Sequence, residues 1–240
     1  MEDNSDFKQN IQYRLSIRFS SDGFSLLVHD KTNLLISSKK VAAPLFSITK
    51  NELIEIIEKE TGDLLNYSDI RIICELDNYV FVPAPLFEIG NESDFFQLEH
   101  KLDIKDCILF NEIASWETVN IFSIPKNLKD AFTHLFKNRP IEHNLSYFLT
   151  DQVKQRNDTV AQIWVRPTLM DIVLLVNGNI HLINSFTYNT PEDFTYYTLN
   201  LYEQLSLDTD TCKVKLFNVG GNNVIQKMLQ KYVKQVEVIS

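Results

Sequence analysis

The segment RLSIRFSSDGFSLLVHDKTNLLISSKK (14–40) decides the fold, because it holds three short strand-like runs separated by turns, and apolar and polar residues alternate in the first run. That alternation is the period of half-buried strands, and Ser21-Asp22-Gly23 is typical turn chemistry. A second segment, VAQIWVRPTLMDIVLLVNGNIHLINSF (160–186), repeats the order of three runs, with Asn177-Gly178 as a strong hairpin signal. Both segments therefore predict a three-stranded meander.

The two meanders align without a gap at an offset of 148 residues. This alignment places Arg18 on Arg166 and Leu34 on Leu182. It also gives the turn between the second and third strands the same length in both copies. We interpret the pattern as an internal duplication.

A helix is predicted after each meander. Thr49 and Glu52 form the pattern of a capping box, and Thr190-Pro191 offers an N-cap followed by a first-turn proline. A strand follows each helix, with Ile72 matching Val214. The repeated unit is therefore strand-strand-strand-helix-strand. A further helix is predicted from Ser93 to about Leu102.

Bulk properties narrow the classes of function. The chain has 240 residues, a net charge of -9 and a pI near 5.1, which disfavours binding to nucleic acid. Its start lacks the basic and apolar regions of a signal peptide, and the longest apolar run, IVLLV (172–176), is far too short to span a bilayer. Cys74, Cys107 and Cys212 are too scattered for a disulfide framework or a zinc site. We therefore expect a cytoplasmic protein.

Two stretches carry a resemblance to a known superfamily. LFNVGGNNVIQKMLQKYV (216–233) resembles the adenosine motif of the actin-like ATPases, a strand that ends in Gly-Gly before a helix. ETVNIFSIPKNLKDAFTHLFKN (117–138) resembles the strand-proline-helix step of the pilus-assembly actin homologues, which are related to the cell-division actins. The chain is also similar to an uncharacterised bacterial family with a ribonuclease H-like fold, a likeness that implies a fold and no known activity.

The resemblance implies an α/β architecture of two βββαβα ribonuclease H-like, or actin-like, units with a cleft between them. We place the first subdomain at residues 1–115 and the second at 116–240, while the polar segment QRND (155–158) is the best boundary by composition. The resemblance also marks Gly220, Gly221 and Asn222 as the turn that would contact a nucleotide.

The sequence departs from the superfamily where chemistry is expected. Actin-like ATPases carry an Asp-x-Gly turn between the first two strands of each unit, which cradles phosphate. Here the first turn has Asp22 directly before Gly23, and the second, VRPTLMDIV (165–173), has no glycine. We therefore predict degenerate phosphate loops, no catalytic residue, no metal site and no cofactor, with ATP as the open alternative. Arg18 and Arg166 remain as candidate anion-binding residues.

These observations favour a non-catalytic actin-like scaffold that binds another protein. One alternative is a nucleotide-binding switch that keeps Gly220-Gly221 without efficient hydrolysis. A second is a metal-dependent nuclease, which needs clustered carboxylates; the first strand offers Ser16, Ile17, Arg18 and Phe19 instead. We expect a protein partner, no nucleic acid and no insertion into a membrane, and the oligomeric state stays open.

Overall fold

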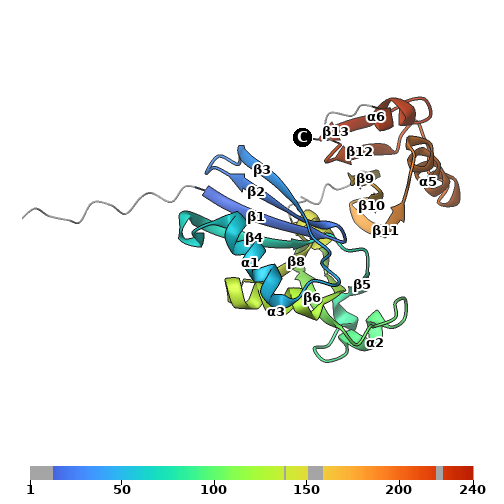
Figure 1. Cartoon of the computed structure of the whole chain (residues 1–240). Coiled ribbons are helices and arrows are strands. Elements are labelled where there is room, and N and C mark those ends of the chain that lie inside the picture. The colour runs from blue at the N-terminus through green and yellow to red at the C-terminus, as the bar shows by residue number, and fades with distance from the viewer. Residues whose placement is uncertain (1–12, 138, 151–158, 220–223, 240) are drawn as a thin grey trace, which may run out of the picture. The chain divides into compact units, whose positions relative to one another are not determined.

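The structure, a computed structural model, describes residues 13–137, 139–150, 159–219 and 224–239 (Figure 1). The chain forms two compact units, residues 1–151 and 152–240, and each is described by itself. The polar segment QRND, which we expected at a boundary, lies outside the described residues. None of the described helices has the length and apolar character that a membrane crossing needs.

The first unit contains eight strands and four α-helices in its described residues. In chain order they are β1 (Tyr13–Ser20), β2 (Gly23–His29), β3 (Leu35–Ala42), α1 (Lys50–Thr61), β4 (Tyr67–Cys74), β5 (Tyr79–Pro83), α2 (Glu92–Phe96), β6 (Asp106–Ile113), β7 (Thr118–Pro125), α3 (Lys126–Phe136), β8 (Ile141–His143) and α4 (Asn144–Thr150).

The main sheet of this unit has the strand order β3-β2-β1-β4-β8. The first three strands are antiparallel, and β4 and β8 run parallel to β1. Leu15, Ile17 and Phe19 alternate along β1 and are all buried, as the two-residue period predicts. Helices α1 and α3 pack together over this core, and Phe132 of α3 lies 5.1 Å from Phe19 between ring centroids.

An inserted module interrupts the unit between β4 and α3. Its three strands form a separate antiparallel sheet of order β5-β7-β6, with α2 packed on it (Figure 1). The helix predicted from Ser93 to Leu102 ends at Phe96. Phe96 is fully buried, whereas Leu98 and Leu102 are exposed, so the residues beyond α2 cover no core that would favour a longer helix.

The two compact units divide later in the chain than the 115/116 boundary that we expected. Strand β7 pairs with β5 and β6, and β8 pairs with β4 of the first sheet. The residues from β7 to α4 therefore complete the first unit instead of opening the second.

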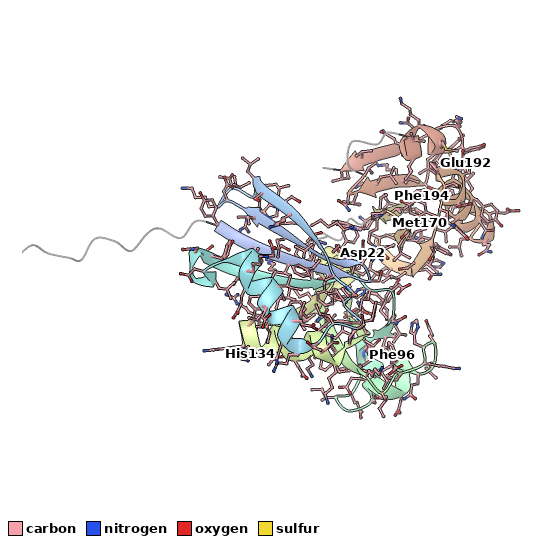
Figure 2. The ribbon with its side chains drawn as sticks, in the orientation of Figure 1. Asp22, Phe96, His134, Met170, Glu192 and Phe194 are labelled. Carbon is pink, nitrogen blue, oxygen red and sulfur yellow. The ribbon has the colours of Figure 1, made fainter. Side chains whose placement is uncertain are left out.

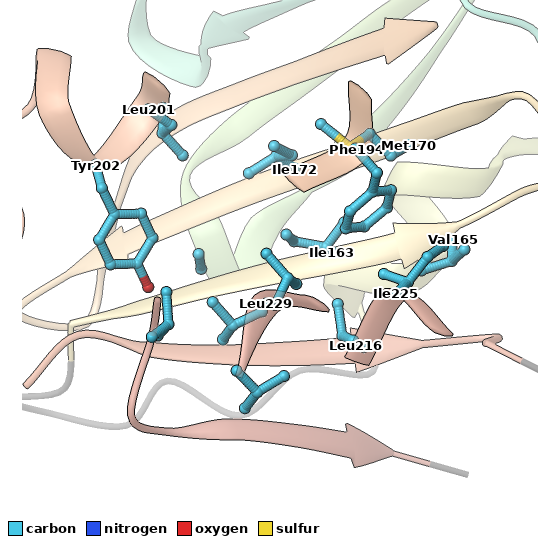
Figure 3. Packing of buried hydrophobic residues seen from close by; sticks show 14 of the residues in the cluster. Ile163, Val165, Met170, Ile172, Phe194, Leu201, Tyr202, Leu216, Ile225 and Leu229 are labelled. Atoms are coloured by element: carbon cyan, nitrogen blue, oxygen red, sulfur yellow. The ribbon is translucent and has the colours of Figure 1, made fainter. Parts of the chain in front are cut away.

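The second unit contains β9 (Val160–Val165), β10 (Leu169–Val176), β11 (Asn179–Thr187), α5 (Pro191–Gln204), β12 (Lys213–Phe217), α6 (Val224–Leu229) and β13 (Val236–Ile239). Its sheet has the order β11-β10-β9-β12-β13. Apolar side chains from β9, β10 and β12 meet those of α5 and α6 in one core (Figure 3). Both predicted helix caps are present: Thr49 and Thr190 each form a capping box, with Glu52 and Asp193 as partners.

The two main sheets share strand order and strand direction, but the predicted residue alignment between them is wrong in two places. Ile17 pairs with Leu26 and Ile72, while Ala161 pairs with Leu174 and Val214. The position equivalent to Arg18 is therefore Gln162, and Arg166 follows β9 in a longer hairpin turn.

The second error concerns the turn that leads into the third strand. In the first sheet His29 pairs with Leu35, so Asp30–Leu34 forms the turn. In the second sheet Val176 pairs with Asn179, which leaves only Asn177-Gly178 between the strands. The offset of 148 residues therefore fits only the second strand, and it misplaces the first and third strands. The first strand is shifted by an even number of residues, which preserves the two-residue period, so a gapless alignment still matched apolar residues there.

Candidate functional site

The carboxyl ends of the parallel strands are the place to look for a site in each unit. In open α/β sheets, ligands bind beyond the carboxyl ends of parallel strands. In the first unit β1, β4 and β8 run parallel, so their ends lie at one edge of the sheet. Arg18 near the end of β1, Glu75 after β4 and Asn144 after β8 meet at this edge.

Arg18 is bound within its own unit by two side chains. Its Nη1 atom donates to Glu75 Oε1 at 2.8 Å and to Asn144 Oδ1 at 2.9 Å. The Arg18 and Glu75 side chains are only 14% and 18% exposed. The guanidinium group also lies over the ring of Tyr147, 5.5 Å from its centroid. The residue that we predicted as an anion site therefore already holds a carboxylate of its own chain.

The first hairpin turn, between β1 and β2, is held by polar contacts on the surface. Asp22 accepts a hydrogen bond from Ser20 Oγ at 2.6 Å and pairs with Lys40 Nζ at 2.8 Å (Figure 2). The hydrogen bond from Lys40 is the main cause that lowers the pKa of Asp22. Gly23 has φ of 140°, and a Cβ there would overlap the carbonyl oxygen of Val41. Asp22 and Gly23 therefore help β2 and β3 to pack closely against each other.

A buried ion pair occupies the start of the second unit's hairpin. Arg166 Nη2 donates to Asp171 Oδ1 at 2.7 Å, and the same oxygen accepts from Ser185 Oγ at 2.6 Å. The side chains of Arg166 and Asp171 are 8% and 0% exposed. Charges this deep in a protein are found paired, because desolvation of a lone charge is costly.

The turn that follows Arg166 is closed by backbone bonds and by Tyr188. The Arg166 amide donates to the Leu169 carbonyl at 2.9 Å, and the Tyr188 amide donates to the Thr168 carbonyl at 3.0 Å. The Tyr188 hydroxyl donates to the Arg166 carbonyl, and burial raises the pKa of this hydroxyl. Met170 points into the core beside Phe194 (Figure 3). The second unit itself therefore supplies hydrogen-bond partners to the backbone of this turn.

The predicted nucleotide turn, Gly220-Gly221-Asn222, lies outside the described residues. The elements on either side fit the expected strand-to-helix step, since β12 ends at Phe217 and α6 begins at Val224. Asn218, just after β12, has φ of 58° and donates through Nδ2 to the Val165 carbonyl at 2.9 Å.

Within the described ranges, no three His, Cys, Asp or Glu side chains are grouped as metal ligands would be. The sequence analysis missed Glu75, Asn144 and Asp171, the partners of the two arginines. A signal existed for Asp171, because it is the one charge inside the apolar run LMDIVLLV (169–176). Glu75 and Asn144 gave none, since they reach Arg18 across 57 and 126 residues of sequence.

His143 is a second buried polar residue at the same edge of the first sheet. Its Nε2 lies 2.8 Å from the Leu76 carbonyl, and its Nδ1 accepts from the Leu145 amide at 3.2 Å. Tyr79 and Phe122 flank the ring at centroid distances of 4.9 and 5.3 Å. With both nitrogens in contact with backbone groups, this histidine links the end of β8 and the start of α4 to the segment that follows β4.

Comparison with known proteins places the chain in a family. A family model described as a protein of unknown function, DUF3822, matches residues 2–236. The chain belongs to the DUF3822 family. No curated protein matches this DUF3822 chain.

Solved structures show the fold. A Bacteroides thetaiotaomicron protein with an actin-like ATPase fold and unknown function is 23% identical, with a TM-score of 0.79 over 98% of this chain and 93% of that one. A chain of the PilM-PilN type IV pilus biogenesis complex is 10% identical, with a TM-score of 0.54 over 95% and 88%. The ethanolamine utilization protein EutJ of Carboxydothermus hydrogenoformans is 7% identical, with a TM-score of 0.50 over 94% and 84%. The predicted actin-like fold is confirmed.

Proposed function

We propose that this DUF3822 chain is a non-catalytic protein of the actin-like fold that acts by binding another protein. The observation that carries the proposal is the closed Arg18–Glu75–Asn144 network at the carboxyl ends of the parallel strands. A phosphate group at this edge would compete with Glu75 for the guanidinium group, and a cation would have to separate Glu75 from Arg18.

The second unit supports the same proposal independently. A phosphate cradle needs backbone amides that point outward without side chains in the way. The β9–β10 turn instead ties its amide at Arg166 to Leu169 and keeps Asp171 inside the sheet, paired with arginine. A carboxylate that binds a metal ion should not already be paired with a positive charge. Glu75 and Asp171 are each paired with an arginine.

The binding half of the proposal rests on fold analogy and on surface chemistry. A PilM-PilN complex is among the structures similar to this chain, so a protein of this fold works within a protein assembly. The acidic net charge of -9 favours protein partners over nucleic acid. We place the protein in the cytoplasm, because its three cysteines are all free thiols, which suits a reducing compartment. We also propose that it works without a cofactor.

Thermal-shift measurements with ATP or ADP, each with and without Mg²⁺, test the non-catalytic half. We expect no rise in the unfolding temperature at nucleotide concentrations up to the millimolar range, because ligand binding to the native state alone would raise it. A stabilisation that Gly221→Val abolishes would overturn the proposal and establish a nucleotide-binding switch. Thr187→Val is the matched control, since it places the same side chain at an exposed position of the edge strand β11 in the same unit.

A further inference from the structure

The inserted module has a small core of its own and an unusual surface. Its core joins Val80 and Val82 of β5 and Val119 and Ile121 of β7 to Phe96 of α2, which Figure 2 labels. The turns that flank α2, in contrast, expose large apolar side chains to solvent.

Five of these exposed apolar residues lie between positions 86 and 104. Ile104 is 96% exposed, Ile89 81% and Leu98 77%, and the other two are Leu86 and Leu102. Scattered apolar residues are normal on a surface, but a local concentration marks an interaction site. No burial in this unit explains why the sequence keeps so many aliphatic residues around one short helix.

A groove of about 470 Å³ opens in the same module. Glu92 and Ser93 of α2 and Leu102 line it on one side, and the three consecutive residues Ile108, Leu109 and Phe110 of β6 line it on the other. Successive side chains of a strand point to opposite faces, so a groove that contacts three in a row reaches the edge of the strand.

The edge of β6 offers backbone groups for pairing. Among the described residues, β6 forms a ladder with β7 alone and ends the sheet of order β5-β7-β6. Near its carboxyl end, Asn111 contacts the backbone of β8 through Ile141 and His143, which holds that part against the main sheet. The edge from Ile108 to Phe110 is the part that faces the groove, and its Phe110 carbonyl already accepts a hydrogen bond from Asn111 Nδ2 at 3.1 Å. Natural sheets seldom leave such an edge next to apolar residues without a partner.

The segment that carries the groove is acidic. Between positions 86 and 106 the chain has Glu88, Glu92, Asp94, Glu99, Asp103 and Asp106 against Lys101 and Lys105, while Lys126 and Lys129 of α3 act on Cys107 near the start of β6. Burial raises the pKa of Asp106, and the nearby charge of Asp103 adds to the rise. A second copy of this chain would bring the same acidic surface against itself in a two-fold interface, and an anionic lipid surface would be repelled.

We infer that the β6 edge and its groove bind an extended, basic segment of a partner protein, which adds to the inserted sheet as a fourth strand. The segment inserts alternate apolar side chains between Leu102 and Phe110 and sets lysine or arginine side chains against Glu92 and the Asp103–Asp106 pair. Backbone hydrogen bonds along β6 supply affinity, and the groove and the charge supply specificity. This inference names the surface through which the proposed binding function operates.

Selection of a displayed random peptide library against the intact chain tests the inference. We expect enriched peptides with alternating apolar residues and a net positive charge. Their affinity should fall about tenfold or more with Leu102→Ser or Glu92→Lys, since hot-spot residues contribute at least that much. Leu34→Ser on the β2–β3 turn and Glu55→Lys on α1 are the matched controls, because both positions are exposed and lie outside the module. Both should leave the affinity unchanged.

Amide hydrogen exchange on the same complexes tests the strand geometry. Bound peptide should slow exchange in the β6 segment and leave β3, another edge strand, unchanged. Selection of no peptide, of acidic peptides, or of peptides insensitive to both groove variants would overturn the inference, as would unchanged exchange in β6. Stabilisation of the chain by nucleotide would instead contradict the proposed non-catalytic function, and it would not change peptide selection or exchange in β6. Failure of the proposed function and failure of the β6 inference can therefore be distinguished.

Discussion

Replacement of Arg166 by methionine removes the positive half of the buried ion pair in the second unit. The Arg166 and Asp171 side chains are 8% and 0% exposed, and their charged atoms lie 2.7 Å apart. Methionine keeps much of the arginine's apolar stem but leaves the Asp171 carboxylate buried without its counter-charge. Loss of one partner from a buried pair costs about 3–5 kcal/mol. We expect that loss in the free energy of unfolding of the second unit.

Urea unfolding followed by tryptophan fluorescence can assign the loss to one unit. The chain has two tryptophans, Trp116 in the first unit and Trp164 in β9 of the second. In a Trp116→Phe background, Trp164 alone reports on the second unit. For a slope of about 1–3 kcal/mol per molar urea, a loss of about 4 kcal/mol lowers the midpoint by roughly 1–4 M.

Two control variants separate burial from charge. Lys234→Met removes an ion pair with Asp210 in the same unit, but both side chains are more than half exposed, so the midpoint should stay within error of the parent. The double variant Arg166→Met/Asp171→Leu removes both buried charges and should recover most of the loss. The reasoning is refuted if Arg166→Met shifts the midpoint no further than Lys234→Met does.

Four further predictions concern other contacts. Gly23→Ala should destabilise the first unit by about 1–3 kcal/mol in urea unfolding, because φ of 140° and the adjacent strand exclude a Cβ; a cost near zero would show that the hairpin adapts. Thr190→Ala should cost about 1 kcal/mol as a lost helix cap. Backbone amides that donate to Asp193 lower the pKa of its carboxyl group. Its contribution to the free energy of unfolding is therefore present above pH 3.8 and is lost as the pH falls below that value. Asp193→Asn should destabilise the second unit at pH 7 and match the parent in acid. His143→Leu should lower the free energy of unfolding by at least about 2 kcal/mol, because two buried backbone groups lose the hydrogen bonds that the imidazole makes to them. His134→Leu, on the exposed face of α3, should be nearly neutral.

Local patterns in the sequence predicted most of the fold. Alternation along β1, the Asn177-Gly178 hairpin and the two capping boxes are short-range signals, and each matches the structure. Pairing between distant segments was harder to predict. Strand β7 was expected from the strand-proline-helix step at residues 117–138, but nothing local indicated that it joins β5 and β6 in a separate sheet.

The candidate site shows the same limit in a sharper form. The residue types at Arg18 and Arg166 indicated positive charge, and that charge suggested an anion. A sequence does not say that Glu75 and Asn144 come from two other strand ends to neutralise and bind Arg18. The alignment of Arg18 with Arg166 failed because the β9–β10 turn is longer than the β1–β2 turn by an even number of residues, so that apolar periodicity matched while the register did not.

A single-turnover hydrolysis assay tests the central claim, that this actin-like chain works by binding and performs no phosphate chemistry. The protein is held in large excess over γ-labelled ATP with Mg²⁺, so that even weak hydrolysis would consume the label. The account predicts that ATP is recovered intact, at the rate of loss seen without protein. Protein-dependent release of phosphate that disappears in Gly221→Val and persists in the exposed-strand control Thr187→Val would contradict it.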